Sequence, residues 1–479
     1  RAGVYREEVG VASSGEEGRP IVIRASAGER VVVSGSDVVK NWRKATKEEC
    51  RGNPHRDRIW VAEIDWRPSA VFQDEWQLQM ARFPAQPRTR YAAEGGDRTR
   101  LVDSVHLTQP AGFWEGGELT VRDASTTNYD KGIIVSYDPD RHELVVDTPR
   151  RDDIEPGKDE YFIKNLVSII SRPGQWAIDT RVSPYRLYLW PREDADPNKA
   201  VIEASRRGGD RLVWWAPGAG HLVFDGLEVC HSEGAGIGGR GSEDSRGHHV
   251  ELRNCVVHHN VDSGVSLSYQ REITIRHCIV AKNGHHGISV GFTKGAVIEE
   301  NEVSGNAEDG VVVGWYSHGV KLVRNLIFGQ WALRHPDGLQ TFAEVKDFLV
   351  QDNLVLNNGQ CWQCANTGPA KVVNNMWVGA RGGCLNLTPR PLVTRSGTFP
   401  PNAEMELSHN TLVFNGSDNM TVLSTFKVHH NIMGAGWRDP KGNFECDSNL
   451  YFGDRVERTL ETYKAAGNDR SSIAAVPKF

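Results

Sequence analysis

The sequence predicts an all-β solenoid, a parallel β-helix, and three observations carry that prediction. One position recurs as asparagine or cysteine at intervals of 23, 23 and 24 residues, and a Gly–apolar pair recurs at the same spacing. A fixed period in the low twenties indicates stacked coils. Between these positions lie short alternating runs such as Val250–Arg253 and Ile273–Arg276, which are typical of strands rather than helices.

The repeat runs from residue 221 to about residue 453. Its recurring position reads Cys255, Cys278, Asn301, Asn325, Asn353, Asn375, Asn410 and Asn431. A second recurring position reads Asn260, Asn283, Asn306 and Gln330. Asparagine at one turn position can stack from coil to coil as a ladder of side-chain amides, and buried cysteine packs there as a small hydrophobe. The Leu-x-x-Leu-x-Leu pattern of leucine-rich repeats is absent, so we expect a β-helix.

Four segments follow in chain order. Residues 1–40 resemble opening coils of the β-helix, and residues 41–217 lose the period and hold nine of the fourteen tryptophans. We expect that segment to be an inserted, Trp-rich β domain. Residues 218–453 form the main β-helix. In residues 454–479, Asp454 can cap a helix that ends at Gly467, and such a helix would cover the last coil.

Composition excludes several classes of function. Lys+Arg number 56 and Asp+Glu 62, giving a net charge of −6, so the 479-residue chain lacks the basic field of a nucleic-acid binder. No stretch approaches the ~20 apolar residues of a membrane span. A hydrophobic content of 39% supplies a large core.

The cysteines give no metal site. Cys361 and Cys364 form a lone CxxC, whereas a zinc site needs a second pair nearby, so packed thiols or a disulfide are expected among the eight cysteines. We predict no cofactor. Because the chain opens at Arg1 inside a strand-like unit, we expect a processed or trimmed N-terminus.

Several strings outside the repeat carry a family resemblance. They are Gly3–Glu7, Val33–Asp37, Met80–Pro84, Arg172–Trp176, Tyr188–Pro191 and the tail Gly467–Ile473. With the repeats, the chain resembles bacterial carbohydrate-active β-helix proteins, and it is similar to the glycoside hydrolases of family 141, which include an α-L-fucosidase. β-Helix polysaccharide lyases and alginate C5-epimerases are related in architecture. The resemblance implies a right-handed β-helix that acts on a sugar.

The catalytic motifs of the related enzymes are not present. The coils lack the Asn-Thr-Asp, Asp-Asp and Gly-His-Gly set of polygalacturonases. They also lack the Asp-Pro-His-Asp motif of alginate epimerases, to which the nearest string is His335–Asp337. The resemblance therefore supplies no catalytic residue, and the candidates must be chosen from their chemistry.

Equivalent residues of adjacent coils lie ~4.8 Å apart, so the residues before each Gly–apolar pair form columns. One column reads Ser263, His286, Asp309 and Asp337, and the column before it reads Asp262, His285, Glu308 and Pro336. Glycoside cleavage needs two carboxyls ~5–9.5 Å apart, so Asp309 and Asp337 are the predicted catalytic pair. His286 and His335 complete the predicted catalytic set, as groups that orient the base or bind substrate.

Aromatic and polar residues of the same coils are the predicted substrate-binding groups. Trp315, Tyr316 and Tyr269 can stack on sugar rings, and Arg334, Gln340 and Glu344 can bind hydroxyl or carboxylate groups. Simpler interpretations exist for single members, because Asp before Gly is common turn chemistry and Trp315 can cap its own coil. Glu300, Arg324 and Asp352 read as a solvated stripe of mixed charge.

Three functions fit these residues. The first is a glycoside hydrolase that uses Asp337 and Asp309 on a poly- or oligosaccharide. The second is a polysaccharide lyase or C5-epimerase, in which Arg334, or Ca²⁺ held by Asp309, Glu308 and Asp337, would neutralise a uronate. The third is a non-catalytic glycan-binding solenoid. All three predict a carbohydrate partner, leave the oligomeric state open, and lead us to expect a secreted or periplasmic protein.

Overall fold

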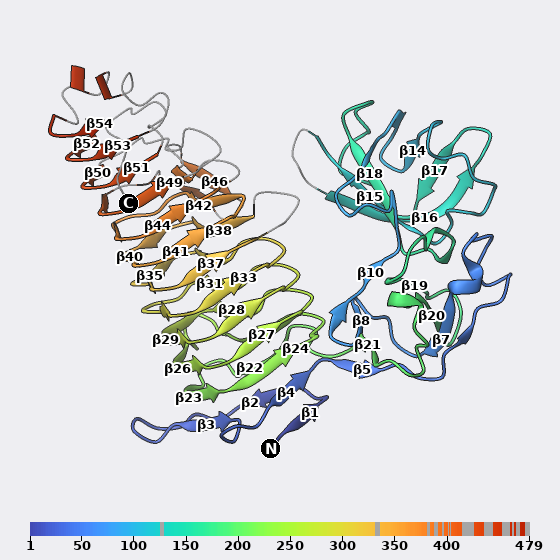
Figure 1. Cartoon of the computed structure of the whole chain (residues 1–479), viewed down its shortest axis with the longest axis horizontal. Coiled ribbons are helices and arrows are strands. Elements are labelled where there is room, and N and C mark those ends of the chain that lie inside the picture. The colour runs from blue at the N-terminus through green and yellow to red at the C-terminus, as the bar shows by residue number, and fades with distance from the viewer. Residues whose placement is uncertain are drawn as a thin grey trace. The chain divides into compact units, whose positions relative to one another are not determined.

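The computed structural model describes residues 1–479 except 125–128, 331–335, 381–383, 388–390, 395–396, 401, 403, 414–425, 435–443, 453–459, 462–463, 466–469 and 475–479. The chain forms two compact units. One comprises residues 1–35 and 207–479, and the other comprises residues 36–206. The first is a solenoid whose strands stack rung upon rung (Figure 1).

Three parallel sheets form the walls of the solenoid, and the counts that follow refer to the described residues. The first sheet has thirteen strands: β1 (Gly3–Tyr5), β4 (Val31–Ser34), β24 (Leu227–Cys230), β27 (Val256–His258), β30 (Ile279–Ala281), β33 (Glu302–Ser304), β37 (Leu326–Phe328), β41 (Leu354–Leu356), β44 (Met376–Val378), β49 (Thr411–Val413), β51 (Ile432–Met433), β53 (Leu450–Tyr451) and β54 (Ile473–Ala474). The second has nine: β2 (Val9–Val11), β22 (Arg211–Trp215), β25 (Ala235–Arg240), β28 (Val265–Ser268), β31 (Ile288–Gly291), β34 (Val311–Gly314), β38 (Asp337–Phe342), β42 (Gln360–Cys364) and β45 (Leu385–Leu387). The third has eleven: β3 (Ile21–Arg24), β23 (Gly220–Asp225), β26 (Gly247–Arg253), β29 (Gln270–Arg276), β32 (Val297–Glu299), β36 (Lys321–Val323), β40 (Phe348–Gln351), β43 (Ala370–Val373), β48 (Met405–Ser408), β50 (Phe426–His429) and β52 (Phe444–Asp447). Two short pairs, β35 (Ser317–His318) with β39 (Val345–Lys346) and β46 (Leu392–Thr394) with β47 (Gly397–Phe399), complete this unit.

The opening strands join the solenoid although almost 200 residues separate them from it. β4 pairs in parallel with β24, with Val33 opposite Val229, and β3 pairs with β23. The blue opening strands therefore continue directly into the green coils (Figure 1). The predicted all-β parallel β-helix is confirmed, and its opening coils are the first residues of the chain.

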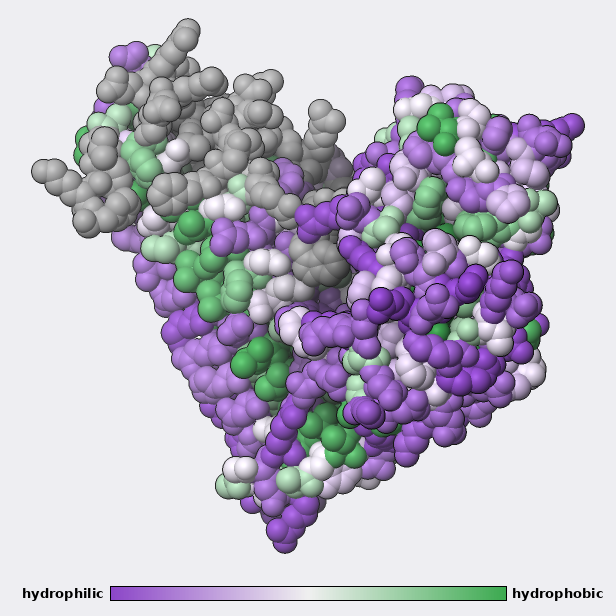
Figure 2. Space-filling model, turned by 45° about the vertical axis from the view of Figure 1, so that its right-hand side comes forward, coloured by the Kyte–Doolittle hydropathy of each residue, from purple (hydrophilic) through white to green (hydrophobic). Residues whose placement is uncertain are grey.

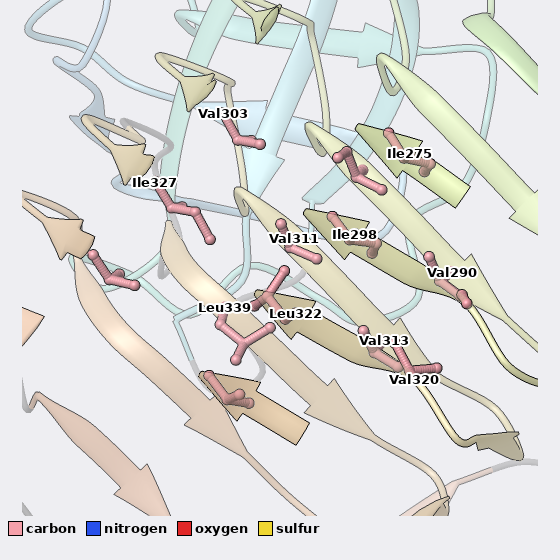
Figure 3. Close-up of a cluster of buried hydrophobic side chains, with 14 of the residues drawn as sticks. Ile275, Val290, Ile298, Val303, Val311, Val313, Val320, Leu322, Ile327 and Leu339 are labelled. Carbon is pink, nitrogen blue, oxygen red and sulfur yellow. The ribbon is translucent and has the colours of Figure 1, made fainter. Parts of the chain in front are cut away.

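Aliphatic side chains from all three walls fill the interior. Every second strand residue points inward, because side chains alternate between the two faces of a strand. Figure 3 shows the result in the central coils: Ile275, Ile298 and Leu322 stack from the third sheet, and Val290 and Val313 from the second. All five are completely buried. The 23- and 24-residue spacing places like residues above one another.

Two amide ladders cross the interior, as the recurring asparagines predict. In the first, the amide of each residue donates to the Oδ1 of the next, for example Asn301 to Asn325 and Asn325 to Asn353, both at 3.0 Å. This ladder begins at Cys278, whose backbone N–H donates to Asn301, and extends through Asn449 to Ser472. Cys255 and Cys278 are buried in its first places, as expected.

The second ladder runs beside the nine-stranded sheet and explains the recurring glycine. It links Ser232, Asn260, Asn283, Asn306, Gln330 and Asn358. A Cβ added to Gly287 would lie 2.5 Å from the carbonyl oxygen of Gly310 and 2.8 Å from the Nδ2 of Asn306. Only glycine leaves room for the ladder amide at this position.

The second unit has its own sheets and its own core. A five-stranded sheet contains β10 (Gln79–Met80), β19 (Gln175–Asp179), β20 (Tyr185–Trp190), β7 (Trp60–Ile64) and β6 (Arg43–Lys44). A largely antiparallel eight-stranded sheet contains β11 (Arg82–Phe83), β18 (Glu160–Lys164), β15 (Glu118–Arg122), β16 (Tyr129–Asp138), β17 (Glu143–Val146), β14 (Arg100–Val102), β13 (Gly95–Gly96) and β12 (Tyr91–Ala92). A third sheet contains β5 (Ser36–Val38), β21 (Ile202–Ser205), β8 (Val71–Gln73) and β9 (Trp76–Gln77), and the 3₁₀ turns are η1 (Arg56–Arg58), η2 (Val167–Ile169) and η3 (Arg192–Asp194). These counts, too, cover only residues that the structure describes.

The remaining features concern the end of the chain and its surface. Residues 460–461 and 464–465 are helical, whereas most of the predicted capping helix at 454–467 lies outside the described residues.

All eight cysteines are buried, and none is in a disulfide. Within the described residues, no helix has the length and hydropathy needed to cross a bilayer. On the face drawn in Figure 2, hydrophilic side chains dominate and apolar ones form separate patches.

Candidate functional site

The predicted acidic and histidine columns lie along one edge of the nine-stranded sheet, where its strands begin. Backbone hydrogen bonds join the column from coil to coil: Gly264 N–H donates to the carbonyl of His286, Gly287 to Asp309, and Gly310 to Asp337. Ser263, His286, Asp309 and Asp337 thus occupy the same place in successive coils. The structure brings three of the four predicted catalytic residues together.

The inner layer of this edge consists of His286, Asp309 and Asp337. Asp309 is 2% exposed; its Oδ1 accepts the backbone N–H of Asp337 at 2.9 Å, and its Oδ2 lies 3.3 Å from Nδ1 of His286. The Asp337 side chain is completely buried. Asp309 is thus oriented by the backbone amide of Asp337 in the next coil, and its other oxygen lies near Nδ1 of His286, which makes no hydrogen bond among the described residues.

The outer layer consists of Asp262, His285 and Glu308, and it is more exposed. Nδ1 of His285 lies 3.1 Å from Asp262 Oδ1, and its Nε2 lies 3.1 Å from Glu308 Oε2. Burial disfavours the charged ring, but the hydrogen bonds to the two carboxylates outweigh it and raise the pKa of His285 to about 9. The hydrogen bond from His285 in turn lowers the pKa of Asp262. At neutral pH the outer layer is an imidazolium between two carboxylates.

The outward face of the nine-stranded sheet beside this edge carries a row of small or amide side chains. Strand pairing aligns Ser266, Ser289, Val312, Gln340, Gln363 and Asn386 across adjacent coils. Arg211 reaches onto the row, and its Nη2 donates to Ser266 Oγ at 3.0 Å. Gln340, a predicted binding residue, is half-buried within the row. The row offers hydrogen-bonding groups of both kinds to a polyhydroxyl ligand.

Aromatic rings line the opposite edge, where the strands end. Tyr269 stacks on Phe292 with ring centroids 4.3 Å apart, and Phe292 is also stacked with Trp315 at 6.5 Å and Tyr316 at 6.0 Å. Trp315 and Tyr316 are 37% and 40% exposed. Phe342 packs edge-on against Trp315 at 4.4 Å. The rings come from four successive coils, with Trp315 and Tyr316 in the same one, and they form an aromatic strip, here defined as Tyr269, Phe292, Trp315, Tyr316 and Phe342.

The carboxylates and the aromatic strip share one sheet but not one place on it. Six residues of nearly extended chain separate Asp309 from Trp315, which corresponds to about 20 Å. Glu344 lies beyond the strip, where its Oε1 is 2.8 Å from Nζ of Lys346 and 3.4 Å from Nε2 of His318. Arg334 and His335 lie outside the described residues.

Sequence reasoning missed two contributors to this face. Phe292 follows Tyr269 by 23 residues and precedes Trp315 by 23, so the period could have identified it. Arg211 carried no such signal, because it comes from a coil that lacks the recurring asparagine.

The acidic edge includes a group of possible metal donors. His285, His286 and Glu308 have ligand atoms within 4.8 Å of one another. A metal ion bound there would have to displace the proton of His285, whose pKa is raised to about 9 by its carboxylate partners. Of the predicted Ca²⁺ ligands, Asp309 and Glu308 already face an amide and two imidazole rings. Elsewhere in the solenoid, His221 with His248 and His249, and Glu228 with Cys230 and His258, form similar clusters.

Comparison with known proteins agrees with this fold. Residues 219–390 match the family model described as "Right handed beta helix region". A search of curated proteins finds no significant sequence match. Among solved structures, a "Glycoside hydrolase" aligns with a TM-score of 0.61 and 13% identity, covering 94% of this chain and 88% of that one. The complex of XylC with xylose aligns with a TM-score of 0.55 and 11% identity, covering 99% of this chain and 80% of that one. In fold, the chain is thus a right-handed β-helix protein, similar over nearly its whole length to both of these structures.

Proposed function

We propose that this protein is a glycoside hydrolase that binds a poly- or oligosaccharide across the nine-stranded sheet and uses Asp309 and Asp337 as its paired carboxyls. The observation that carries the proposal is the placement of these two buried groups on neighbouring coils, with Oδ1 of one accepting the backbone N–H of the other at 2.9 Å. Glycoside hydrolysis needs such a pair. The solved structures that align over most of the chain, one of them a glycoside hydrolase, support the same class of substrate.

The chemistry divides between the two carboxyls. One donates a proton to the glycosidic oxygen as the bond from that oxygen to the anomeric carbon breaks. The other either removes a proton from the water that attacks the anomeric carbon, or attacks that carbon itself and forms a glycosyl ester, which water then cleaves with the first carboxyl as the base. His286 is placed to orient Asp309, because its Nδ1 lies 3.3 Å from the Oδ2 of that residue. The products are a new reducing end and a new hydroxyl.

The rest of the sheet supports a ligand that extends away from the carboxyls. Gln340, Gln363 and the serines of the row can bind hydroxyl groups, and the aromatic strip can stack on sugar rings about 20 Å from Asp309. The substrate-binding roles of Trp315, Tyr316 and Tyr269 are then those of distant subsites. We further propose a secreted or periplasmic location, because polymeric carbohydrate is met there.

The charge of the acidic edge favours hydrolysis over elimination. A lyase or epimerase must neutralise a uronate carboxylate, whereas the described edge gathers Asp262, Glu308, Asp309 and Asp337 around one imidazolium. Arg211, a described cation of this face, is already bonded to Asp210 at 2.5 Å.

The test is incubation with a panel of neutral and uronate-containing polysaccharides, with reducing ends and ultraviolet absorbance measured together. Hydrolysis predicts reducing ends without the absorbance of an unsaturated uronate. Asp337→Asn and Asp309→Asn should each lower the rate at least ~100-fold, since a positioned acid or base contributes about that much. Glu300→Gln is the matched control, because Glu300 is an exposed carboxylate of the same solenoid, paired with Arg324 at 2.7 Å.

Three results would contradict the proposal. Absorbance that rises with the reducing ends would identify elimination. Full activity in folded Asp337→Asn and Asp309→Asn, judged by an unchanged melting temperature, would refute the site. Polysaccharide binding without any product would identify a non-catalytic glycan-binding solenoid.

A further inference from the structure

The unit of residues 36–206 contains a pocket that the solenoid site does not use. Its walls come from three segments, Pro54–His55, residues 82–85 and residues 168–171, together with Tyr91, Gln109, Phe113 and Trp114. All of these residues belong to one compact unit. The pocket is therefore a property of that unit alone.

A buried arginine without a counter-ion lines this pocket. Arg82 is 6% exposed, and no described carboxylate lies within ion-pair distance of it. Its Nη1 donates to the carbonyls of Pro84 and Gln86, and its guanidinium lies 4.1 Å above the ring of Phe162. Burial, followed by the nearby charge of Arg90, lowers the pKa of Arg82 to about 10, so the group stays charged at neutral pH.

Two polar atoms of the lining remain without a hydrogen-bond partner among the described residues. They are Nη2 of Arg82 and Oγ of Ser168, which is 5% exposed. An unpaired buried charge and an unsatisfied hydroxyl each cost folding free energy. Such groups are typical of sites where a ligand supplies the missing hydrogen-bond partner. For a guanidinium with an unused N–H, the strongest partner is an anion such as a carboxylate.

The rest of the lining is aromatic. Phe83 contacts the rings of Tyr91 and Trp114 at 5.3 and 5.0 Å, and Phe113 packs edge-on against Trp114 at 4.8 Å. Phe83, Tyr91 and Phe113 are partly exposed, so their surfaces are available to a ligand. Aromatic faces pack against the C–H face of a sugar ring, and Gln109 and Ser168 offer polar contacts.

We propose that this pocket binds a sugar that carries a carboxylate, with Arg82 pairing with the carboxylate and the aromatic wall contacting the ring. The carboxylate follows from Arg82, while the sugar rests on the function proposed above. Because Nη2 is closed to solvent in the free protein, binding moves a side chain of the wall, a change that is common at binding sites.

The test is calorimetric binding of D-glucuronate, D-glucose and benzoate to the full chain and to its variants. We expect glucuronate to bind at least tenfold more tightly than glucose. Arg82→Met should weaken glucuronate binding at least tenfold, and a melting curve of the same variant checks that it is folded, because the substitution also removes the hydrogen bonds of Arg82 to the carbonyls of Pro84 and Gln86. Phe113→Ala is a second variant, expected to weaken glucuronate as well. Arg67→Met is the control, since Arg67 is half-exposed and ion-paired with Glu118.

The outcomes separate this proposal from the catalytic one, since binding is measured without turnover. Unchanged glucuronate affinity in Arg82→Met and in Phe113→Ala would overturn the pocket assignment, even if the protein cleaves polysaccharide. Equal affinity for glucose and glucuronate would overturn the role of Arg82. Benzoate binding as tightly as glucuronate would overturn the assignment of a sugar.

Discussion

Replacing Asn325 by alanine removes one rung from the middle of the first ladder. The Asn325 side chain is 2% exposed and takes part in five hydrogen bonds. Its Nδ2 donates to the carbonyls of Ile298 and Val323 and to Asn353, and its Oδ1 accepts the backbone and side-chain N–H groups of Asn301. Alanine can make none of these bonds.

The expected loss follows from the groups left behind. The backbone N–H of Asn301 loses its acceptor inside a dry core, and one unsatisfied buried group costs ~1–3 kcal/mol. The carbonyls of Ile298 and Val323 lose a hydrogen-bond donor, and the shorter side chain leaves a small cavity. We therefore expect the free energy of unfolding to fall by about 3 kcal/mol in total. With a urea slope of about 3 kcal/mol/M, the unfolding midpoint moves down by about 1 M.

The assay is urea unfolding followed by circular dichroism, with Lys371→Ala as the control. Lys371 is an exposed residue of strand β43 in the same solenoid. A surface substitution of this kind changes the stability by under ~0.5 kcal/mol. Equal midpoints for the two variants would refute the view that the buried ladder stabilises the coils.

Three further predictions concern packing, protonation and binding. Gly287→Ala should lower the free energy of unfolding by about 1–3 kcal/mol, because the new Cβ would lie 2.5 Å from a carbonyl oxygen. Gly209→Ala is the control, since a Cβ there has open space and should leave the stability unchanged. Melting curves of the two variants test this difference. His285 has a raised pKa of about 9 against an ordinary 6.5, so it stabilises the fold below pH 6.5 and that contribution is lost as the pH rises to about 9. His285→Gln should flatten this part of the stability–pH profile, and an unaltered slope would contradict the assignment. Trp315→Ala should raise KM severalfold with little change in kcat. Ile279→Ala is the control, because Ile279 lies on another sheet and is 42% exposed, and it should alter neither constant. If Trp315→Ala lowered kcat as much as Asp337→Asn does, Trp315 would not belong to a distant subsite.

The repeat made the solenoid predictable because its spacing has a direct physical cause. Ladder asparagines such as Asn301 and Asn325 must recur once per coil, and the glycine at 287 must recur where the next ladder amide approaches. The stacking of Asp309 on Asp337 follows from the same rule.

The sequence could not place residues along the strands in the same way. The column rule says which residues share a position in successive coils, but the length of each strand decides how far apart two columns lie. The aromatic rings and the carboxyls come from the same coils, but Trp315 follows Asp309 only after the whole length of strand β34. The pocket around Arg82 lies in a segment without a period, where nothing in the sequence indicates which side chains meet.

In the first ladder, the geometry of the core does not depend on the number of residues between successive rungs. Successive rungs Asn325, Asn353, Asn375 and Asn410 lie 28, 22 and 35 residues apart, yet their amide contacts stay at 2.9–3.0 Å. The number of residues between rungs can therefore change without altering the core. Lineages of this fold can lengthen or exchange a loop in one coil and so acquire a new specificity while the neighbouring coils keep their structure. For protein engineering, the stretches between rungs are natural places to graft new binding loops.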